Sequence, residues 1–242
     1  MVYFERIFVE LHGPSVGIGA GITAVVIVAA FFAFGSMSQS EIELQPATIP
    51  EAEEEAISMS VFTANGSPLL GNPNAPITLV EFGDYQCHFC NVFFHETEDD
   101  ILKNYVETGK VRMMFKDFTI IGPDSVNAAH GAHCANDQGL FWEYHDELYN
   151  NWNGENNGWA SPENLKRFAE NVQLDIEQWE ECMVGKNYDQ RIKDSNNDAR
   201  TLGLTGTPAF FVIGPTDQVT KIGGAQPFYV FEQIFESELG KQ

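Results

Sequence analysis

The stretch Ile77-Thr78-Leu79-Val80-Glu81-Phe82, followed by Cys87-His88-Phe89-Cys90, decides the fold of this chain. The first run is mostly apolar and predicts a buried strand, and the two cysteines open a predicted helix that extends to about Thr108. Cys87 therefore lies at a helix N-terminus, where unpaired backbone N–H groups and the helix dipole stabilise a thiolate. Cys90 lies one turn deeper on the same helical face, so we expect Cys87 to be exposed and Cys90 to be shielded. This placement favours thiol–disulfide exchange over half of a zinc site or a structural disulfide.

The chain is strongly acidic. Its 242 residues include 35 acidic and 13 basic side chains, which give a formal net charge of −22. Such a surface repels nucleic acid and anionic lipid headgroups, so we expect neither as a binding partner. The length allows one domain of ordinary size plus an additional segment. The hydrophobic content of 43% is enough for a hydrophobic core and excludes wholesale disorder.

An uncharged, apolar segment occupies residues 16–34. At 1.5 Å per residue it would span about 28 Å, close to the hydrocarbon thickness of a bilayer. The segment is longer than the apolar core of a secretory signal peptide, and Ala33-Phe34-Gly35 is a poor cleavage site. We therefore favour an uncleaved signal anchor over a signal peptide. Arg6 precedes the segment and no basic residue follows it before Lys103, which predicts that residues 1–15 are cytoplasmic and that the remainder lies outside.

Residues 35–60 are expected to form an acidic linker to a domain over residues 61–242, because they are rich in glutamate and lack apolar periodicity. Within the domain we expect strands over 77–82, 111–118, 209–213 and 218–222, and a closing helix over 228–239. A helical insertion occupies about 123–200, with Ser161 and Asp175 as N-caps. The predicted order is β-α-β, insertion, β-β-α.

Thr207-Pro208 lies directly before the third predicted strand, where proline is sterically allowed. A cis bond would expose the Thr207 backbone beside the active-site disulfide, so that an extended substrate could pair with it. The alternative is an ordinary trans loop proline, since cis accounts for only about 5–6% of X–Pro bonds.

Several stretches together resemble the DsbA-like oxidoreductases of the thioredoxin fold. They are Leu70-Gly71-Asn72-Pro73-Asn74-Ala75-Pro76, Glu81-Phe82, Cys87-His88-Phe89-Cys90 and Gly206-Thr207-Pro208-Ala209-Phe210, together with 135–139, Phe141-Trp142 and Tyr144-His145 in the insertion. The resemblance covers about Ser67 to Leu239 and implies a thioredoxin-like α/β fold with a helical insertion. It also implies that Cys87 is the nucleophile, that Cys90 is the resolving thiol and that Pro208 is cis. The chain departs from many relatives at His88, where they carry proline, and this leaves the redox potential open.

Glu81 lies six residues before Cys87. On an edge strand it would be a surface carboxylate. In a central strand it would be buried, with a raised pKa, and able to take the proton of Cys90. Thioredoxin-fold proteins place an acid at this position, so the resemblance favours the buried acid. For His88 two interpretations stay open: a donor of a hydrogen bond or charge to the Cys87 thiolate, or a solvated side chain.

The remaining two cysteines lie in the predicted insertion. His130, His133, Cys134 and His145 outline a metal site, but zinc ligands normally show tighter paired spacing, so we expect no metal and no other cofactor. Cys134 lies in an alanine-rich helix and Cys182 on an apolar helical face. They are either bonded to each other or unpaired in the core. Some DsbA-like relatives carry a second disulfide in this insertion, so the resemblance favours a structural Cys134–Cys182 disulfide.

Together these features predict a membrane-anchored protein-disulfide oxidoreductase that faces the extracytoplasmic side. It is expected to oxidise cysteine pairs of exported proteins through Cys87 and Cys90, and the resemblance implies reoxidation by a quinone-linked membrane protein. One alternative is a disulfide reductase or isomerase of the same fold. Another, from a different class, is a copper- or zinc-binding module that uses Cys87, Cys90 and His88.

Overall fold

The computed structural model describes residues 58–241. The predicted cytoplasmic segment, the predicted signal anchor and nearly all of the predicted acidic linker lie outside these residues. Between residues 58 and 241, no helix combines the length and the apolar character that a membrane span requires.

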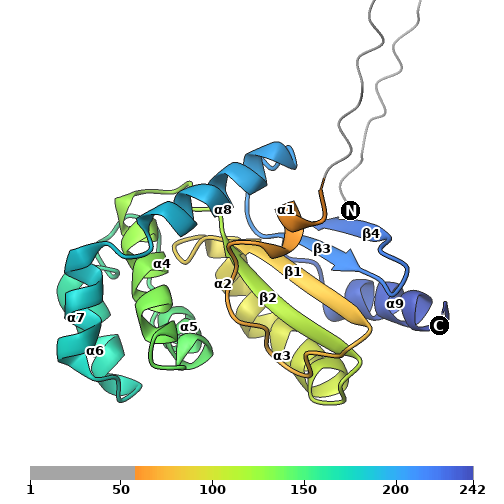
Figure 1. Ribbon diagram of the computed structural model, residues 1–242, viewed down its shortest axis with the longest axis horizontal. Helices are drawn as coiled ribbons and strands as arrows, with labels where there is room; N and C mark the ends of the chain where they lie inside the picture. The colour runs from red at the N-terminus through yellow and green to blue at the C-terminus, as the bar shows by residue number, and fades with distance from the viewer. Residues whose placement is uncertain (1–57, 242) are drawn as a thin grey trace, which may run out of the picture. The chain divides into compact units, whose positions relative to one another are not determined.

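A four-stranded sheet in the order β2-β1-β3-β4 forms the centre of the domain (Figure 1). Its strands are β1 (Ile77–Gly83), β2 (Val111–Asp117), β3 (Ala209–Ile213) and β4 (Val219–Gly223). β1 pairs in parallel with β2 and antiparallel with β3, and β3 pairs antiparallel with β4. The four strands were predicted to within one residue at each end, and the β-α-β, insertion, β-β-α order of a thioredoxin-like fold is confirmed.

The parallel pair β1 and β2 requires a crossover connection, which a continuous run of helix supplies. It consists of α2 (His88–Phe93), the π-helical segment η1 (Phe94–Glu98), α3 (Asp99–Ile101) and a second π-helical segment, η2 (Leu102–Val106). The predicted helix is therefore present, but in two segments its backbone hydrogen bonds change from the α-helical to the π-helical spacing. Such π segments are uncommon and often lie near functional sites.

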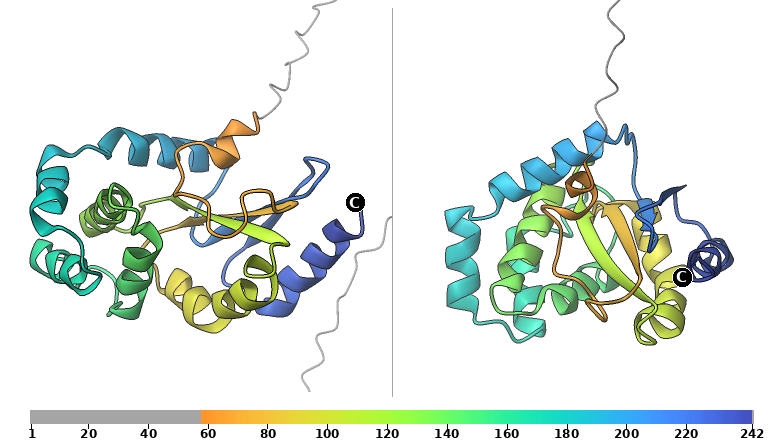
Figure 2. Two further views of the ribbon diagram at one scale, coloured as in Figure 1. Left: turned by 60° about the horizontal axis from the view of Figure 1, so that its bottom comes forward. Right: turned by 45° about the vertical axis from the view of Figure 1, so that its right-hand side comes forward.

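Helices cover both faces of the sheet (Figure 2). On one face, Ile77 and Leu79 of β1 pack under the crossover helix and α9 (Phe228–Leu239). On the other face, Val80 and Phe82 pack with residues of α1 (Ser60–Thr63) and α8 (Asp189–Thr201). Every residue of β1 is consequently buried, as is typical of a central strand covered on both sides.

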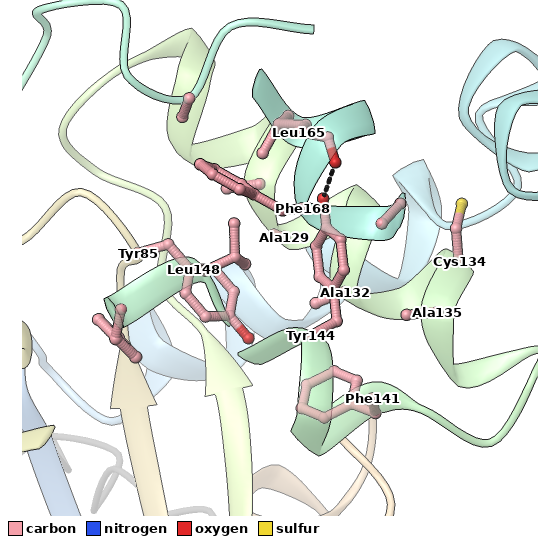
Figure 3. Packing of buried hydrophobic residues seen from close by; sticks show 14 of the residues in the cluster. Tyr85, Ala129, Ala132, Cys134, Ala135, Phe141, Tyr144, Leu148, Leu165 and Phe168 are labelled. Atoms are coloured by element: carbon pink, nitrogen blue, oxygen red, sulfur yellow. Dashed lines mark hydrogen bonds between the residues drawn. The ribbon is translucent and has the colours of Figure 1, made fainter. Parts of the chain in front are cut away.

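The helical insertion forms a second core beside the sheet (Figure 3). Its helices are α4 (Pro123–Asn136), α5 (Phe141–Asn150), α6 (Pro162–Asn171) and α7 (Ile176–Gly185), after which α8 returns to the sheet. Tyr144 of α5 donates a hydrogen bond to the carbonyl oxygen of Leu165 in α6, at 3.0 Å. A Cβ atom on Gly131 would lie 2.8 Å from Tyr144 Oη, so the close approach of α4 and α5 requires glycine there.

The two predicted N-caps are confirmed. Ser161 Oγ accepts a hydrogen bond from the Asn164 N–H at 3.3 Å, and Asp175 Oδ1 accepts one from the Gln178 N–H at 3.1 Å. Each cap satisfies a backbone donor that the first helical turn leaves free.

Cys134 of α4 and Cys182 of α7 form a disulfide, with their Cα atoms 5.8 Å apart. The bond joins two helices of the insertion that the intervening α5 and α6 separate in the sequence. Both cysteines are buried.

Replacing both of these cysteines by alanine should lower the free energy of unfolding by about 4 kcal/mol, because the bond closes a loop whose ends are 48 positions apart. Urea unfolding of C134A/C182A and of the wild type measures this, with the Cys87–Cys90 disulfide formed in both proteins. The variant should keep the wild-type reactivity of Cys87. An unchanged urea midpoint would contradict the prediction.

Candidate active site

The turn that leads from β1 into α2 is held by the side chain of Asp84. Asp84 Oδ1 accepts a hydrogen bond from the Gln86 N–H at 2.9 Å. Asp84 Oδ2 accepts hydrogen bonds from the N–H groups of Ile120 and Ile121 at 2.8 and 3.1 Å. The backbone N–H of Cys87 donates to the Asp84 carbonyl at 2.9 Å. One buried carboxylate therefore ties the turn before the thiols to the loop after β2.

Cys87 is the N-cap residue of α2, with φ −68° and ψ 124°, as its sequence position predicted. Cys87 and Cys90 are free thiols. The expectation of an exposed Cys87 was wrong, because only 6% of this residue is exposed, against 0% for Cys90. The segment before β3 contributes to the burial of Cys87, because the Cys87 thiol donates a hydrogen bond to the Thr207 carbonyl oxygen at 3.3 Å.

The two thiols have opposite electrostatic surroundings. A hydrogen bond from the Cys90 thiol lowers the pKa of Cys87 to about 6 despite burial, and the N–H groups of Cys90 and Phe89 contribute to the shift. Burial, the hydrogen bond to Cys87 and the charge of Glu81 raise the pKa of Cys90 well above its ordinary value. A thiolate cannot donate a hydrogen bond, so ionisation of Cys87 releases its contact with the Thr207 carbonyl. At neutral pH the pair therefore holds one thiolate beside one thiol.

The Thr207–Pro208 peptide bond is cis and directly precedes β3. The Pro208 carbonyl oxygen accepts a hydrogen bond from the Gly224 N–H at 2.9 Å. Beside this bond the surface is hollowed by about 310 Å³, and the lining comes from 203–209 together with Lys221, Gly223 and Gly224. Thr207 thus lines the hollow and also contacts the Cys87 thiol through its carbonyl oxygen.

Glu81 is 1% exposed and lies in the central strand, which excludes a surface carboxylate. It shares a face of β1 with Ile77 and Leu79, the face that the crossover helix covers. Neither carboxylate oxygen has a hydrogen-bond partner within residues 58–241. Burial raises the pKa of Glu81 well above its usual range, and the charges of Glu98 and Cys87 raise it further.

Two further buried groups, Glu98 of η1 and His145 of α5, lie on the same side of the sheet. Burial raises the pKa of Glu98 to about 8, with a further contribution from Asp146. Burial lowers the pKa of His145 to about 3. Glu98 was not among the site residues expected from the sequence. Its spacing of eight residues from Cys90 was the available signal, because positions four and eight apart share a helical face.

His88 is exposed, and its ring centroid lies 5.3 Å from that of Phe89 and 5.6 Å from that of Trp152. Within residues 58–241, no hydrogen bond joins the His88 ring to Cys87. Its backbone N–H, at the first position of α2, donates to Glu155 Oε1 at 3.1 Å. A carboxylate of the insertion therefore occupies one donor of the helix N-terminus. Nothing in the local sequence around Glu155 indicated this contact.

The loop that carries Glu155 is anchored to the turn before Cys87 through Gln86. The Trp152 indole N–H donates to the Gln86 carbonyl at 2.9 Å, and the Asn156 N–H donates to Gln86 Oε1 at 2.8 Å. Gln86 Nε2 also donates to Ser125 Oγ at 3.0 Å. Gln86, fully buried, thereby links the thiol turn to two parts of the insertion.

The four residues that outlined a metal site in the sequence do not form one. Cys134 is in the disulfide, and His133 Nε2 lies 2.7 Å from Asp117 Oδ2. His130 Nδ1 lies 3.3 Å from Asp189 Oδ1. All three histidines of the set, His145 included, are buried, so they are packing residues and not residues of a helix surface.

The comparisons with known proteins agree with this geometry. Residues 63–218 match the protein family described as Thioredoxin. The chain is 29% identical over 158 residues to the probable disulfide bond formation protein D of Bacillus anthracis, covering 64% of this chain and 73% of that protein. It is 27% identical over 159 residues to disulfide bond formation protein D of Bacillus subtilis, covering 64% and 70% of the two chains.

Solved structures show the same fold. Oxidised BdbD from Bacillus subtilis superposes with a TM-score of 0.65 at 25% identity, covering 72% of this chain and 93% of that one. Wolbachia pipientis α-DsbA1 superposes with a TM-score of 0.64 at 26% identity, covering 73% and 92%. A CxxC pair at the N-terminus of the crossover helix and a cis-proline beside it accompany these matches. The chain therefore belongs to the thioredoxin family and is a thiol:disulfide oxidoreductase of the DsbA and BdbD type.

Proposed function

We propose that this oxidoreductase works as an oxidase, which transfers the Cys87–Cys90 disulfide to cysteine pairs of exported proteins. One observation carries the proposal: the Cys87 thiolate is stabilised, with a pKa of about 6. A stabilised thiolate favours the reduced form of the enzyme, and an enzyme with a stable reduced form is a strong oxidant.

The exchange proceeds in two steps that balance electrons and protons. A substrate thiolate attacks Cys87 Sγ, the Cys87–Cys90 bond breaks, and Cys90 leaves with the electron pair and takes up a proton. The second substrate thiolate then attacks the substrate sulfur of the mixed disulfide, and Cys87 leaves as a thiolate. The substrate loses two electrons and gains a disulfide, and the enzyme becomes the dithiol form.

Glu81 is the proposed proton donor and acceptor for Cys90. Its burial raises the pKa of the carboxyl group and so favours the protonated form, which can supply the proton that Cys90 needs as a leaving group. In reoxidation the same carboxylate takes the proton back. The interaction between Glu81 and Cys90, each of which is fully enclosed, supports this role.

Thr207 and Pro208 are proposed to position the substrate. An extended substrate segment would hydrogen-bond to the Thr207 backbone and place its cysteine at Cys87, and the hollow lined by 203–209 would receive neighbouring side chains. Phe89, which is 59% exposed beside the thiols, adds an apolar contact. His88 is proposed to tune the site through its packing with Trp152, and the Cys134–Cys182 disulfide to stabilise the insertion.

The cellular location that we propose for the protein is inferred from its sequence. Residues 16–34 would anchor the protein with residues 1–15 in the cytoplasm, and residues 35–60 would connect the anchor to the catalytic domain over 61–242 on the extracytoplasmic side. A quinone-linked membrane protein would reoxidise the dithiol form. The Cys134–Cys182 disulfide supports an oxidising compartment.

The reduction potential of the Cys87–Cys90 pair tests the proposed direction. Equilibration with glutathione should give a value near −120 mV, as in oxidases, rather than near −270 mV, as in thioredoxin. The oxidised protein should also introduce disulfides into a reduced, unfolded protein in stoichiometric amounts. A value near −270 mV would instead assign the chain to the reductases.

Alkylation of the reduced protein should follow a titration with its midpoint near pH 6, and the first label should be on Cys87. Cys90→Ala should move the midpoint upward, because the main hydrogen bond to the thiolate is lost. The pKa of Cys87 is lower in the folded than in the unfolded state, where it is about 8.5. Its contribution to the stability of the reduced protein is therefore complete above about pH 8.5 and is lost as the pH falls through about 6. Equal early labelling of both thiols would overturn the assignment.

Glu81→Gln should slow the steps in which Cys90 gains or loses a proton by about 100-fold at neutral pH, since an amide cannot exchange the proton. Stopped-flow measurement of the reduction and reoxidation rates as a function of pH distinguishes slower proton transfer at Cys90 from an altered pKa of Cys87. The exposed Glu96→Gln is the matched control and should leave both rates unchanged. Wild-type rates with an unchanged pH profile in Glu81→Gln would show that Glu81 is not the proton carrier.

A further inference from the structure

Glu98, His145 and Asp146 bring three metal-ligand atoms together where the crossover helix faces α5. Glu98 ends η1, and the other two residues are neighbours in α5. The three ligand atoms lie within 4.8 Å of one another. In the sequence His145 was grouped with His130, His133 and Cys134, whereas the fold places it beside Glu98 of η1 and Asp146 of α5.

Two of these side chains present buried polar atoms that no group in the described part of the chain satisfies. Glu98 is 2% exposed and His145 is 0% exposed. Within residues 58–241, neither Glu98 Oε2 nor His145 Nε2 has a hydrogen-bond partner. Buried polar atoms are nearly always paired, and an unpaired imidazole nitrogen next to an unpaired carboxylate oxygen is the donor arrangement that a cation completes.

Tyr85 holds the His145 ring in the orientation that metal binding requires. Tyr85 Oη lies 3.0 Å from His145 Nδ1. When Nδ1 donates its hydrogen to this oxygen, the lone pair is on Nε2, the nitrogen without a protein partner. The rings of Phe115, Trp142 and Tyr149 enclose the imidazole, with centroid distances of 5.0, 5.1 and 5.0 Å. The ring is thus fixed before any ligand arrives.

Asp146 gives the cluster its access to solvent, because it is exposed while its two partners are enclosed. Ligand atoms around a tetrahedral ion are roughly 3.4 Å apart, for bonds of about 2.1 Å. All three ligand atoms lie within 4.8 Å of one another, and rotation of the exposed Asp146 side chain can shorten its distances to the other two. Asp99 and Glu143 act electrostatically on Asp146, so the surrounding potential also favours a cation.

We propose that Glu98, His145 and Asp146 bind one divalent cation of the zinc class, with water as the remaining ligand. One imidazole and two carboxylates suit a borderline metal such as Zn²⁺. Ca²⁺ and Mg²⁺ require mainly oxygen ligands and a larger coordination number than three side chains provide. The site is distinct from the thiol pair and uses none of the groups assigned above to the exchange reaction.

Binding of Zn²⁺ alone to the full-length protein tests the proposal, with the Cys87–Cys90 disulfide formed so that no thiolate competes. Calorimetry at pH 7.5 should show one saturable site per chain. Asp146→Asn, an exposed change that leaves the core intact, and the near-isosteric Glu98→Gln should each weaken it by at least tenfold. Glu163→Gln, an exposed change in the first turn of α6, is the matched control and should bind as the wild type does.

Nitrogen NMR of the histidine rings provides a second, local readout. Zn²⁺ should shift the His145 Nε2 signal and leave those of the exposed His88 and His95 in place. Absence of a saturable site would overturn the proposal. Wild-type affinity in both Asp146→Asn and Glu98→Gln would also overturn it, because the Zn²⁺ would then bind adventitiously elsewhere. Competition by Ca²⁺ or Mg²⁺ at concentrations equal to Zn²⁺ would overturn the assignment of the metal class.

Discussion

Burial of β1 on both faces is the constraint on which the rest of the active site depends. The strand is central in the sheet, with β2 and β3 as its neighbours and helices above and below. A carboxylate on such a strand has no access to water, so Glu81 becomes a weak acid next to the thiols. At the end of the strand the chain passes so close to Phe115 that a Cβ on Gly83 would lie 2.4 Å from the ring. Directly beyond Gly83, the turn held by Asp84 delivers Cys87 to the start of α2.

Burial of the nearby carboxyl groups also explains how the Cys87 thiolate can be stable although acidic residues surround it. Ionised carboxylates near Cys87 would raise its pKa and oppose its chemistry. Because Glu81 and Glu98 are enclosed, their pKa values are raised, that of Glu98 to about 8, which favours their neutral forms and weakens their repulsion of the thiolate. The thiolate then experiences the helix N-terminus and the Cys90 thiol. Glu155 is the exposed exception, since its carboxylate accepts a hydrogen bond from the first N–H of α2.

The helical insertion is part of the site as well as a cover for it. Cys87 and Cys90 belong to the same apolar cluster as the insertion residues Tyr149 and Trp159. The loop between α5 and α6 contacts Gln86 twice, so a displacement of the insertion would also displace the turn that sets the position of Cys87. The Cys134–Cys182 disulfide restrains the insertion itself. Through these contacts the insertion and the sheet position the thiols together.

The strands, the N-caps Ser161 and Asp175 and the place of Cys87 at a helix N-terminus could be predicted from the sequence, because these features depend on short-range patterns of apolar and capping residues. Together with the family resemblance, it also indicated the cis bond before Pro208 and the Cys134–Cys182 pair. The burial of Cys87, the contact of Glu155 with α2 and the proximity of Glu98 to His145 became apparent only from the folded chain. These contacts join residues up to 120 positions apart, as between Cys87 and Thr207. Local periodicity holds no information about which distant side chains the packing of helices on a sheet brings together.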